Sequence, residues 1–380
     1  MSHFKFAAVT MPPTAETLRQ EVRAFLDRER ESGGFTPALG AMVADDAAFS
    51  IKCGTQGYLG MTWPKRYGGH ERTMLERYVV VEELLAAGAP VMAHWIADRQ
   101  SGPQILRHGS ERAKQMILPR IAAGRCFFAI GMSEPDTGSD LASVRTRAHK
   151  TEGGYKVTGR KVWTSYAHKA DYVIALVRTS GSVEQRQVGL SQLIIDMKTP
   201  GISIRPIHNI HGGHDFNEVT FDDVFVPEDM TVGGEGQGWA MVTSELAYER
   251  SGPDRFMSSY VLLMAAIDAA GPNPSGHQAM ELGRIIAHLA TLRRMSSSIA
   301  GMLNDGQSPV TEAALVKDLG TTLEQQTPEI VRRILPTDAH QGSAYVALQR
   351  LSQLQSVSYS IRGGTREILR GMIARGLGLR

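Results

Sequence analysis

Cysteine is scarce in this sequence, which has only Cys53 and Cys126 among 380 residues. Two cysteines cannot build a disulfide framework or a zinc site made of cysteines. An excess of one charge sign is also lacking, because 41 lysines and arginines almost balance 39 aspartates and glutamates and leave a formal net charge of +2. Without a basic field to hold a phosphate backbone, the composition argues against a nucleic-acid-binding protein.

Long hydrophobic runs are missing as well. The longest stretch without a formal charge, residues 84–97, has 14 residues and is interrupted by Gly88 and Pro90. A helix needs about 20 apolar residues to cross a bilayer, so this stretch is too short. The sequence does not open on a basic segment followed by an apolar core and a small-residue cleavage site. We therefore expect a cytoplasmic protein with no membrane segment, and we expect no metal site.

The remaining composition, with 42% hydrophobic and 21% charged residues, is typical of a globular protein, and 380 residues are enough for two or three domains. The apolar pattern divides the chain into three parts. Residues 1–125 have helical periodicity, residues 126–235 contain short apolar runs typical of strands, and residues 236–380 return to the helical period. We therefore predict an N-terminal helical domain, a middle β domain and a C-terminal helical bundle.

Caps and breakers place several of these helices. In the first part, Thr14 can cap a helix, a second helix should cover about residues 73–87, and Ser110 can cap a third that Pro119 ends or kinks. Short loops separate the later helices, which favours antiparallel neighbours in a bundle. The later expected helices cover residues 239–250, 260–270, 279–303, 311–335 and 340–356, with a last helix capped by Thr365.

Residues 132–140, Met-Ser-Glu-Pro-Asp-Thr-Gly-Ser-Asp, form the first segment with chemical potential. Proline and glycine force an irregular backbone there, and the segment carries several amides and hydroxyls. Such a loop can offer hydrogen-bond donors to an electron-rich ring or a phosphate. The alternative is a plain surface turn between two domains.

Three further segments follow. The first is Lys-Val-Trp-Thr-Ser at residues 161–165, where Trp163 is either a core residue or a ligand contact. The second runs from Phe216 through Gly238-Trp239 to Glu249-Arg250, and the third is Ile-Arg-Gly-Gly-Thr-Arg-Glu-Ile at residues 361–368.

In this order and spacing, the four segments resemble the acyl-CoA dehydrogenase family of flavoproteins, over residues 10–378. The resemblance implies an α+β multidomain fold with an N-terminal all-α domain, a middle β-barrel-like domain and a C-terminal four-helix bundle. It implies an oxidoreductase that uses FAD and acts on acyl-CoA thioesters in fatty acid or steroid catabolism. The family implies a flavin ring between the β domain and the C-terminal helices.

The resemblance also assigns residues to the cofactor and the substrate. Backbone and hydroxyl contacts to the flavin are implied for Ile130, Met132, Ser133, Gly138 and Ser139, ring-edge contacts for Trp163, Thr164 and Ser165, and contacts from the last helix for Thr365 and Glu367. Substrate contacts are implied for Ser139, Arg250 and Gly364.

The reaction implied by the family removes a proton from the α carbon of the thioester and a hydride from the β carbon, so a carboxylate must act as the base. Many members carry that base two residues before the C-terminal threonine, where this chain has Gly363. A second subgroup carries it on a bundle helix directly before an arginine, where this chain has Glu249 before Arg250. The loss at one position and the gain at the other indicate Glu249 as the base. Alone, Glu249-Arg250 would be an ordinary solvated helix pair.

Two family elements that contact the adenine and diphosphate half of FAD across a subunit interface are missing. Residues 271–278 lack the usual Arg-x-x-Phe-Gly-x-Pro pattern, and residues 340–345 replace a Gln-x-x-Gly-Gly-x-Gly element. A self-sufficient homotetramer is therefore in doubt. The resemblance instead favours an oligomer, with an α2β2 complex of two different subunits as one form, and an electron-transferring flavoprotein as the electron acceptor.

The substrate is less determined: a bulky or steroid-derived acyl-CoA is preferred from the position of Glu249 and from the resemblance to heteromeric members. Arg362 can pair with a substrate carboxylate, although a solvated arginine is the simpler interpretation. Three alternatives stay open: a flavin oxidase of the same fold, a non-catalytic or half-site subunit of a heteromeric enzyme, and a plain helical interaction protein.

Overall fold

The computed structural model describes residues 6–40, 44–244, 250, 252–340 and 342–379. These residues form two compact units. The first takes the described residues of Met1–Asp45, Arg72–Val91 and Ala247–Arg380, and the second takes those of Asp46–Glu71 and Met92–Leu246. The N-terminal helices are thus shared between both units. The order of helices, sheet and helices along the chain is as expected, and the domain boundaries 1–125, 126–235 and 236–380 stay a prediction.

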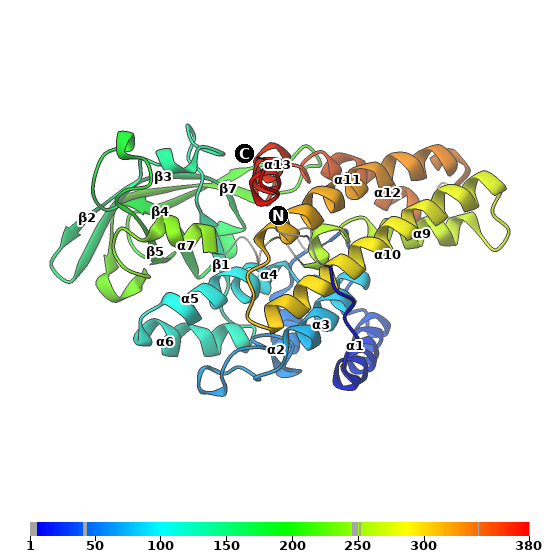
Figure 1. Cartoon of the computed structure of the whole chain (residues 1–380), viewed down its shortest axis with the longest axis horizontal. Coiled ribbons are helices and arrows are strands. Elements are labelled where there is room, and N and C mark those ends of the chain that lie inside the picture. Colours follow the sequence, from blue (N-terminus) through cyan, green and yellow to red (C-terminus); the bar gives the residue numbers. More distant parts are fainter. Residues whose placement is uncertain (1–5, 41–43, 245–249, 251, 341, 380) are drawn as a thin grey trace. The chain divides into compact units, whose positions relative to one another are not determined.

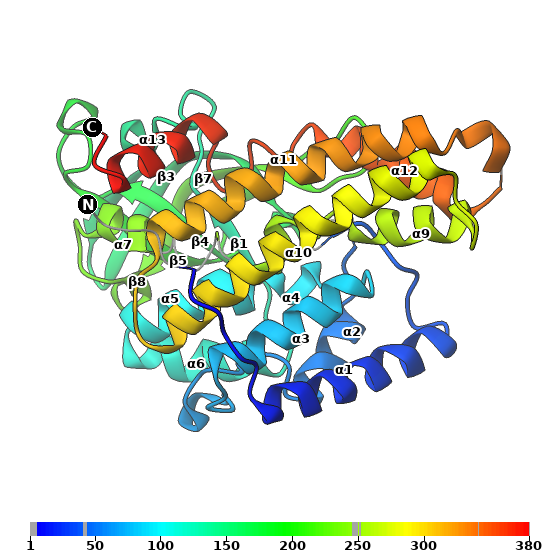
Figure 2. The same cartoon turned by 45° about the vertical axis from the view of Figure 1, so that its right-hand side comes forward.

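The first unit is helical. Helix α1 packs on α3, and α9 to α12 pack together as a bundle, with α13 against α11 (Figures 1 and 2). Its helices are α1 (Pro13–Glu31), α3 (Met74–Ala86), α9 (Tyr260–Ala270), α10 (Gly276–Asn304), α11 (Val310–Ile334), α12 (Ala344–Ser356) and α13 (Arg366–Gly376).

The helix starts show which capping expectations hold. Thr73 caps α3 in a capping box with Glu76, so the expected second helix is confirmed with its cap. Thr14 does not cap α1, and this expectation is wrong: Pro12 is the N-cap residue and Thr14 lies inside the helix. The reason is Pro13, whose fixed φ and missing N–H suit the first helical position.

A buried ionic network joins α1 to α3 and α10. Arg19 of α1 is only 6% exposed and pairs with Glu82 and Glu83 of α3. Arg293 of α10 binds the same Glu82, with Nε 2.6 Å from Oε1. Each buried carboxylate meets guanidinium donors, and these pairs fix how the helices pack, although Nη2 of Arg19 has no partner among the described residues.

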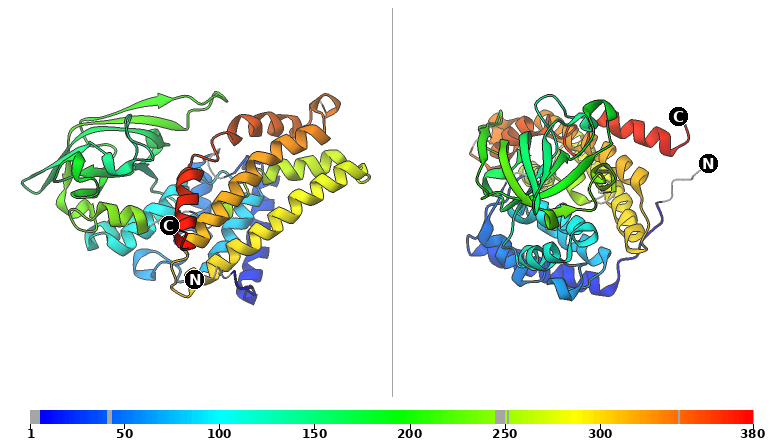
Figure 3. Two further views of the ribbon diagram at one scale, coloured as in Figure 1. Left: turned by 45° about the horizontal axis from the view of Figure 1, so that its top comes forward. Right: turned by 90° about the vertical axis from the view of Figure 1, so that its left-hand side faces the viewer.

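The second unit combines a sheet with short helices. The strands form one eight-stranded sheet in the order β6-β7-β3-β2-β4-β5-β8, with β1 pairing in parallel with β4 (Figure 3, green ribbons). The strands are β1 (Phe128–Gly131), β2 (Arg147–Thr151), β3 (Gly154–Ser165), β4 (Tyr172–Arg178), β5 (Leu190–Asp196), β6 (Ile202–Ile207), β7 (Phe216–Pro227) and β8 (Thr231–Val232). The helices of this unit are α2 (Ala47–Thr55), α4 (Met92–Ile96), α5 (Gly102–His108), α6 (Glu111–Ala122) and α7 (Gly238–Ser244).

Strand β4 lies in the core of the sheet. All seven residues of β4 are buried, which fits its continuous apolar run and its central place in the sheet.

Ser110 caps α6 as expected, but Pro119 does not end that helix, which continues to Ala122. No helix in the described part of the chain is long and apolar enough to cross a bilayer.

His94 of α4 is a buried titratable group outside the predicted site. It is 2% exposed, and its Nδ1 lies 2.8 Å from Oγ of Ser50 on α2. Burial lowers the pKa of His94 to about 4, and the charge of Asp98 offsets only part of that effect. A histidine in the unfolded chain titrates near pH 6.5, so the unfolded state takes up a proton between about pH 6.5 and 4 that the folded state does not.

We therefore expect His94 to lower the free energy of unfolding as the pH falls from 6.5 towards 4. The variant His94→Gln keeps a polar partner for Ser50 and does not titrate. It should flatten the acid side of the stability curve by up to about 1.4 kcal/mol per pH unit. Urea unfolding of both proteins from pH 7 to pH 4 measures this difference. Parallel curves would contradict the expectation.

Candidate functional site

The loop 132–140 follows β1 and is folded as a tight hairpin. The amide of Glu134 donates to the carbonyl of Thr137 at 2.8 Å, and the amide of Thr137 donates back at 3.0 Å. Pro135 and Asp136 form the tip. The predicted alternative of a plain surface turn does not describe this hairpin fully, because Glu134 and Thr137 are 7% and 5% exposed.

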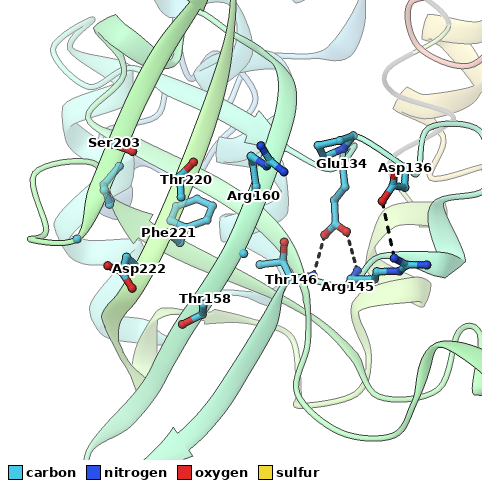
Figure 4. A pocket seen from close by; sticks show the side chains of 14 residues that line it. Glu134, Asp136, Arg145, Thr146, Thr158, Arg160, Ser203, Thr220, Phe221 and Asp222 are labelled. Carbon is cyan, nitrogen blue, oxygen red and sulfur yellow. Dashed lines mark hydrogen bonds and ion pairs between the residues drawn. The ribbon is translucent and has the colours of Figure 1, made fainter.

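A buried ion pair anchors the hairpin to the sheet. Nζ of Lys161, on β3, lies 2.8 Å from Oε1 of Glu134 and 3.0 Å from the carbonyl oxygen of Met132. The carboxylate of Glu134 also accepts from the backbone amides of Arg145 and Thr146, at 2.6 and 2.9 Å (Figure 4). These donors on the carboxylate fix the path of the chain from Met132 to Glu134.

Burial acts on both charges of this pair. It lowers the pKa of Lys161 to about 8, against the attraction of Glu134. Burial alone would raise the pKa of Glu134, but the Lys161 ammonium and the hydrogen-bond donors outweigh it and hold that pKa below its ordinary value. The pair is therefore ionised at neutral pH, and each partner compensates the buried charge of the other.

Beside the hairpin tip the sheet is hollowed (Figure 4). The hollow has a volume of about 740 Å³ and lies over β3, β6 and β7, where Arg160, Ser203 and Thr220 line it. At its edge, Nη1 of Arg145 lies 3.7 Å from Oδ2 of Asp136. This mixture of both charges and hydroxyls is typical of the solvated face of an antiparallel sheet.

A bulge in β3 aims Trp163 outward. The pairing of β3 with β7 shifts register between Lys161 and Thr164, and Trp163 has a φ of 58°. The indole is 58% exposed and meets the ring of Phe216 edge-on, with centroids 6.0 Å apart. The core interpretation of Trp163 is therefore wrong. A left-handed conformation in a bulky residue costs free energy and is found where a side chain must point in a set direction.

Asn217 of β7 holds the segment behind this bulge. It is fully buried, and its Nδ2 donates to the carbonyl of Thr164 at 3.0 Å. Its Oδ1 lies 3.2 Å from Nδ1 of His168 and 2.8 Å from Nε2 of His214, whose rings stack with centroids 4.0 Å apart. Because an amide oxygen only accepts, both of these ring nitrogens carry a proton. Sequence reasoning did not single out Asn217.

Three buried hydroxyls near these segments have no partner among the described residues. They belong to Thr137 of the hairpin, Thr164 of β3 and Thr146, whose amide binds Glu134. At Gly138, a Cβ would meet no described atom within 4 Å. Unsatisfied donors next to an exposed indole and an open stretch of backbone fit a planar, polar group such as a flavin ring.

The structure places eight of the predicted contact residues in this second unit. Ile130 lies on β1 and Ser165 at the end of β3, and both are partly buried. In the loop, Met132 and Ser133 are partly buried, and Ser139 is exposed.

The other predicted residues lie in the first unit, around the turn before α13. Thr365 caps α13, with its Oγ1 3.5 Å from the amide of Ile368, and Glu367 is exposed in the first turn. Gly363 and Gly364 have φ values of 65° and 92°. This left-handed region favours glycine, so both positions depend on that residue type. Glu249 lies outside the described residues.

Two buried cations bind the carbonyls of this turn. Nε of Arg250 lies 3.1 Å from the carbonyl oxygen of Gly363, and Nζ of Lys317 lies 2.8 Å from that of Gly364. Arg250 is 4% exposed and Lys317 is 1% exposed. Lys317 was not predicted; the signal that could have found it is its position on the buried face of α11, next to Val316.

Arg362 is not the solvated arginine that the sequence favoured. Its Nη2 lies 2.6 Å from Oγ of Ser258 and 3.0 Å from Oε2 of Glu324, a carboxylate that is 1% exposed. Its guanidinium stacks over the ring of Tyr359, 4.3 Å from the centroid. Glu324 comes from α11, 38 residues earlier, so the local sequence gives no sign of this pair.

Comparisons with known proteins find two family models that match this chain and several similar proteins. Residues 12–125 match the model of the acyl-CoA dehydrogenase N-terminal domain, and residues 129–224 match that of the middle domain. Acyl-CoA dehydrogenase FadE29 of Mycobacterium tuberculosis is 32% identical over 96% of this chain and 97% of its own length. Acyl-CoA dehydrogenase FadE26 of the same organism is 31% identical over 97% and 98%.

Two solved structures share the fold at moderate identity. The ChsE4–ChsE5 complex from Mycobacterium tuberculosis superposes with a TM-score of 0.82 and 30% identity, covering 98% of this chain and 100% of that chain. The Tcur3481–Tcur3483 steroid ACAD superposes with a TM-score of 0.84 and 27% identity, covering 99% and 100%.

Proposed function

The chain belongs to the acyl-CoA dehydrogenase family, and on that premise we propose that it dehydrogenates an acyl-CoA thioester between the α and β carbons with FAD as its cofactor. The observation that carries the cofactor is the outward Trp163 at a left-handed bulge, beside the unpartnered hydroxyls of Thr137 and Thr164. FAD, when bound, supplies the acceptor for the β hydride.

The proposed cofactor contacts lie in three segments of the chain. The hairpin loop offers backbone and hydroxyl groups, β3 offers the indole, and the start of α13 offers its cap and first turn. The proposed contacts are Ile130, Met132, Ser133, Gly138, Ser139, Trp163, Thr164, Ser165, Thr365 and Glu367.

Glu249 is the proposed base. Its carboxylate takes the α proton, and the electron pair of the broken C–H bond moves towards the thioester. An enclosed carboxylate facing an apolar acyl chain has a raised pKa, which suits a base that works near neutral pH. Ser139, Arg250 and Gly364 are the proposed substrate contacts, and the bond from Arg250 to the Gly363 carbonyl supports a role for Arg250 at this turn.

Anaerobic mixing with a panel of CoA thioesters tests the activity. The panel runs from butyryl-CoA and isobutyryl-CoA to a steroid side-chain thioester, and bleaching of the flavin absorbance is the readout. We expect purified protein to carry FAD and at least one thioester to reduce it, with bulky acyl groups fastest. Protein that binds no flavin, alone or with a partner subunit, would overturn the proposal. Rapid reoxidation of the reduced flavin by air would identify an oxidase, and electron-transferring flavoprotein is the proposed acceptor otherwise.

We also propose a second, different subunit of the same family. Two of the similar structures are named as pairs, ChsE4–ChsE5 and Tcur3481–Tcur3483. Residues 271–278 and 340–345 of this chain lack the family patterns for the adenine half of FAD. Co-expression with a neighbouring gene product should raise the flavin-to-chain ratio above that of the lone chain. A homo-oligomer with one FAD per chain and full turnover would contradict a heteromer.

A further inference from the structure

The side chain of Arg362, just before the two glycines of the turn that leads to α13, is fixed in its orientation. Its Nη2 lies 2.6 Å from Oγ of Ser258 and 3.0 Å from Oε2 of Glu324 on α11, so both hydrogens of Nη2 have an acceptor. The guanidinium lies over the ring of Tyr359, with Cζ 4.3 Å from the ring centroid. A planar guanidinium that is bonded at one nitrogen and stacked on one face has little freedom to turn.

The other nitrogens of this guanidinium keep their donors. An arginine side chain has five N–H groups, so three of them remain on Nε and Nη1. No residue that the structure describes accepts a hydrogen bond from these two nitrogens. The side chain of Arg362 is 24% exposed, while that of Glu324 is 1% exposed. The accessible part of the pair therefore belongs to Arg362, which still has donors to offer.

The carboxylate of Glu324 determines which oxygen these donors suit. It cancels the formal charge of Arg362, and it is too buried for water to screen it. A ligand carboxylate would bring a second negative charge to the same guanidinium, and the two carboxylates would repel each other. A ketone or hydroxyl oxygen accepts the same hydrogen bonds without adding charge. A plain alkyl group would cover the three N–H groups and leave them without an acceptor, which is unfavourable.

The position of Arg362 in the chain brings it to the proposed substrate site. It directly precedes Gly363 and Gly364, and Gly364 is a proposed substrate contact. Nε of Arg250, another proposed contact, lies 3.1 Å from the carbonyl oxygen of Gly363. An acyl group held at this turn therefore lies within reach of the residue that begins it.

We propose that Arg362 selects thioesters whose acyl group carries a neutral oxygen, in a ketone or a hydroxyl group, and that Glu324 excludes acyl groups that carry a carboxylate. This inference rests on the proposed function and names the substrate class of that site. It differs from the pairing of Arg362 with a substrate carboxylate that the sequence left open.

Matched acyl chains test this selection. Sets of CoA thioesters based on hexanoyl, octanoyl and decanoyl chains each contain the plain chain, a chain that ends in a methyl ketone and the isosteric chain that ends in a carboxylate. The flavin-loaded enzyme is reduced beforehand with dithionite, so that a bound thioester is not dehydrogenated, and calorimetry gives the dissociation constants. In at least one set, the ketone should bind about 10- to 100-fold more tightly than both other members.

Variants separate the roles of the two side chains. Glu324→Gln removes the negative charge, so the carboxylate thioester should gain about 10-fold or more relative to the ketone. The double variant Arg362→Met with Glu324→Gln removes the donors without stranding a charge, and it should bind the ketone and the plain chain within about threefold of each other. Arg366→Met is the matched control, because Arg366 pairs with Asp318 of the same helix at 2.8 Å and is also 24% exposed. It should keep the wild-type order.

Equal binding of the ketone and the carboxylate thioester in every set would overturn the inference, and so would a ketone that binds no better than the plain chain. Both results need only the wild-type protein, so they count even if a variant does not fold. Flavin reduction by thioesters that bind without this order would leave the proposed function intact. A wild-type protein whose flavin no thioester reduces would overturn the proposed function itself.

Discussion

Replacing Glu249 with glutamine is expected to slow reduction of the bound flavin by acyl-CoA by roughly 10²–10⁴-fold, with the flavin content unchanged. Glutamine keeps the size and shape of glutamate, but its amide cannot take up the α proton. The prediction follows from the pairing of Glu249-Arg250 with Gly363 at the alternative base position. Stopped-flow absorbance under anaerobic conditions measures the rate.

Glu329→Gln is the control for this prediction, because Glu329 is an exposed carboxylate of the same bundle that pairs with Arg332. It should leave the rate unchanged. Normal flavin reduction by Glu249→Gln would show that Glu249 is not the base. Either a partner subunit then supplies the base, or this chain does no chemistry.

Moving the carboxylate to the other family position gives a second check on Glu249. The double variant Glu249→Gln with Gly363→Glu should recover part of the rate. Recovery should be incomplete, because Gly363 has a φ of 65°. A residue with a Cβ pays roughly 1–2 kcal/mol in that conformation.

The second large effect concerns the buried pair beneath the hairpin loop. We expect Lys161→Met to lower the free energy of unfolding by about 3–5 kcal/mol, the usual cost of leaving one buried charge without its partner. Lys161 is fully buried and Glu134 has 6% of its side chain exposed, so solvent cannot replace the lost ammonium. The loss of the bond to the Met132 carbonyl should also lower the flavin content. Urea unfolding and flavin extraction measure the two effects.

Lys150→Met is the matched control for Lys161→Met, because Lys150 pairs with Glu228 at 3.1 Å on the surface, with both side chains more than half exposed. Lys150→Met should leave the free energy of unfolding almost unchanged, because exposed ion pairs contribute little to stability. The double variant Lys161→Met with Glu134→Gln should be more stable than Lys161→Met, since it removes the stranded charge. If the free energy of unfolding of Lys161→Met lies within about 1 kcal/mol of the wild-type value, the pair does not anchor the loop.

Periodicity predicted the helical elements well because it depends on which face of a helix is apolar. The run 260–270 is α9 as predicted, and the expected helix 311–335 is α11 within one residue at each end. Trp163 shows where the method fails. Alternation along a strand assumes an unbroken register, and the bulge between Lys161 and Thr164 turns the indole outward. No single-sequence pattern marks that shift.

The candidate site contains residues that its local sequence could not reveal. The loop and turn segments were recognisable because their residue types are unusual and close together in sequence. Lys317 and Asn217 act on those segments from distant elements, so only the fold brings them there. Arg362 was judged by its neighbours in sequence, while its partner Glu324 lies one helix away.

Helix α11 contacts the turn before α13 through four side chains: Lys317 binds the Gly364 carbonyl, Asp318 and Thr322 bind Arg366, and Glu324 binds Arg362. These contacts limit where the chain can gain or lose residues. Lys317, Asp318, Thr322 and Glu324 lie on one side of the helix, and each residue of an α-helix turns the next by about 100°. Inserting or deleting one residue between Asp318 and Thr322 would rotate the later contacts away while leaving the earlier ones in place. Length variation in relatives is therefore expected in the segments before and after α11, and not within its central turns.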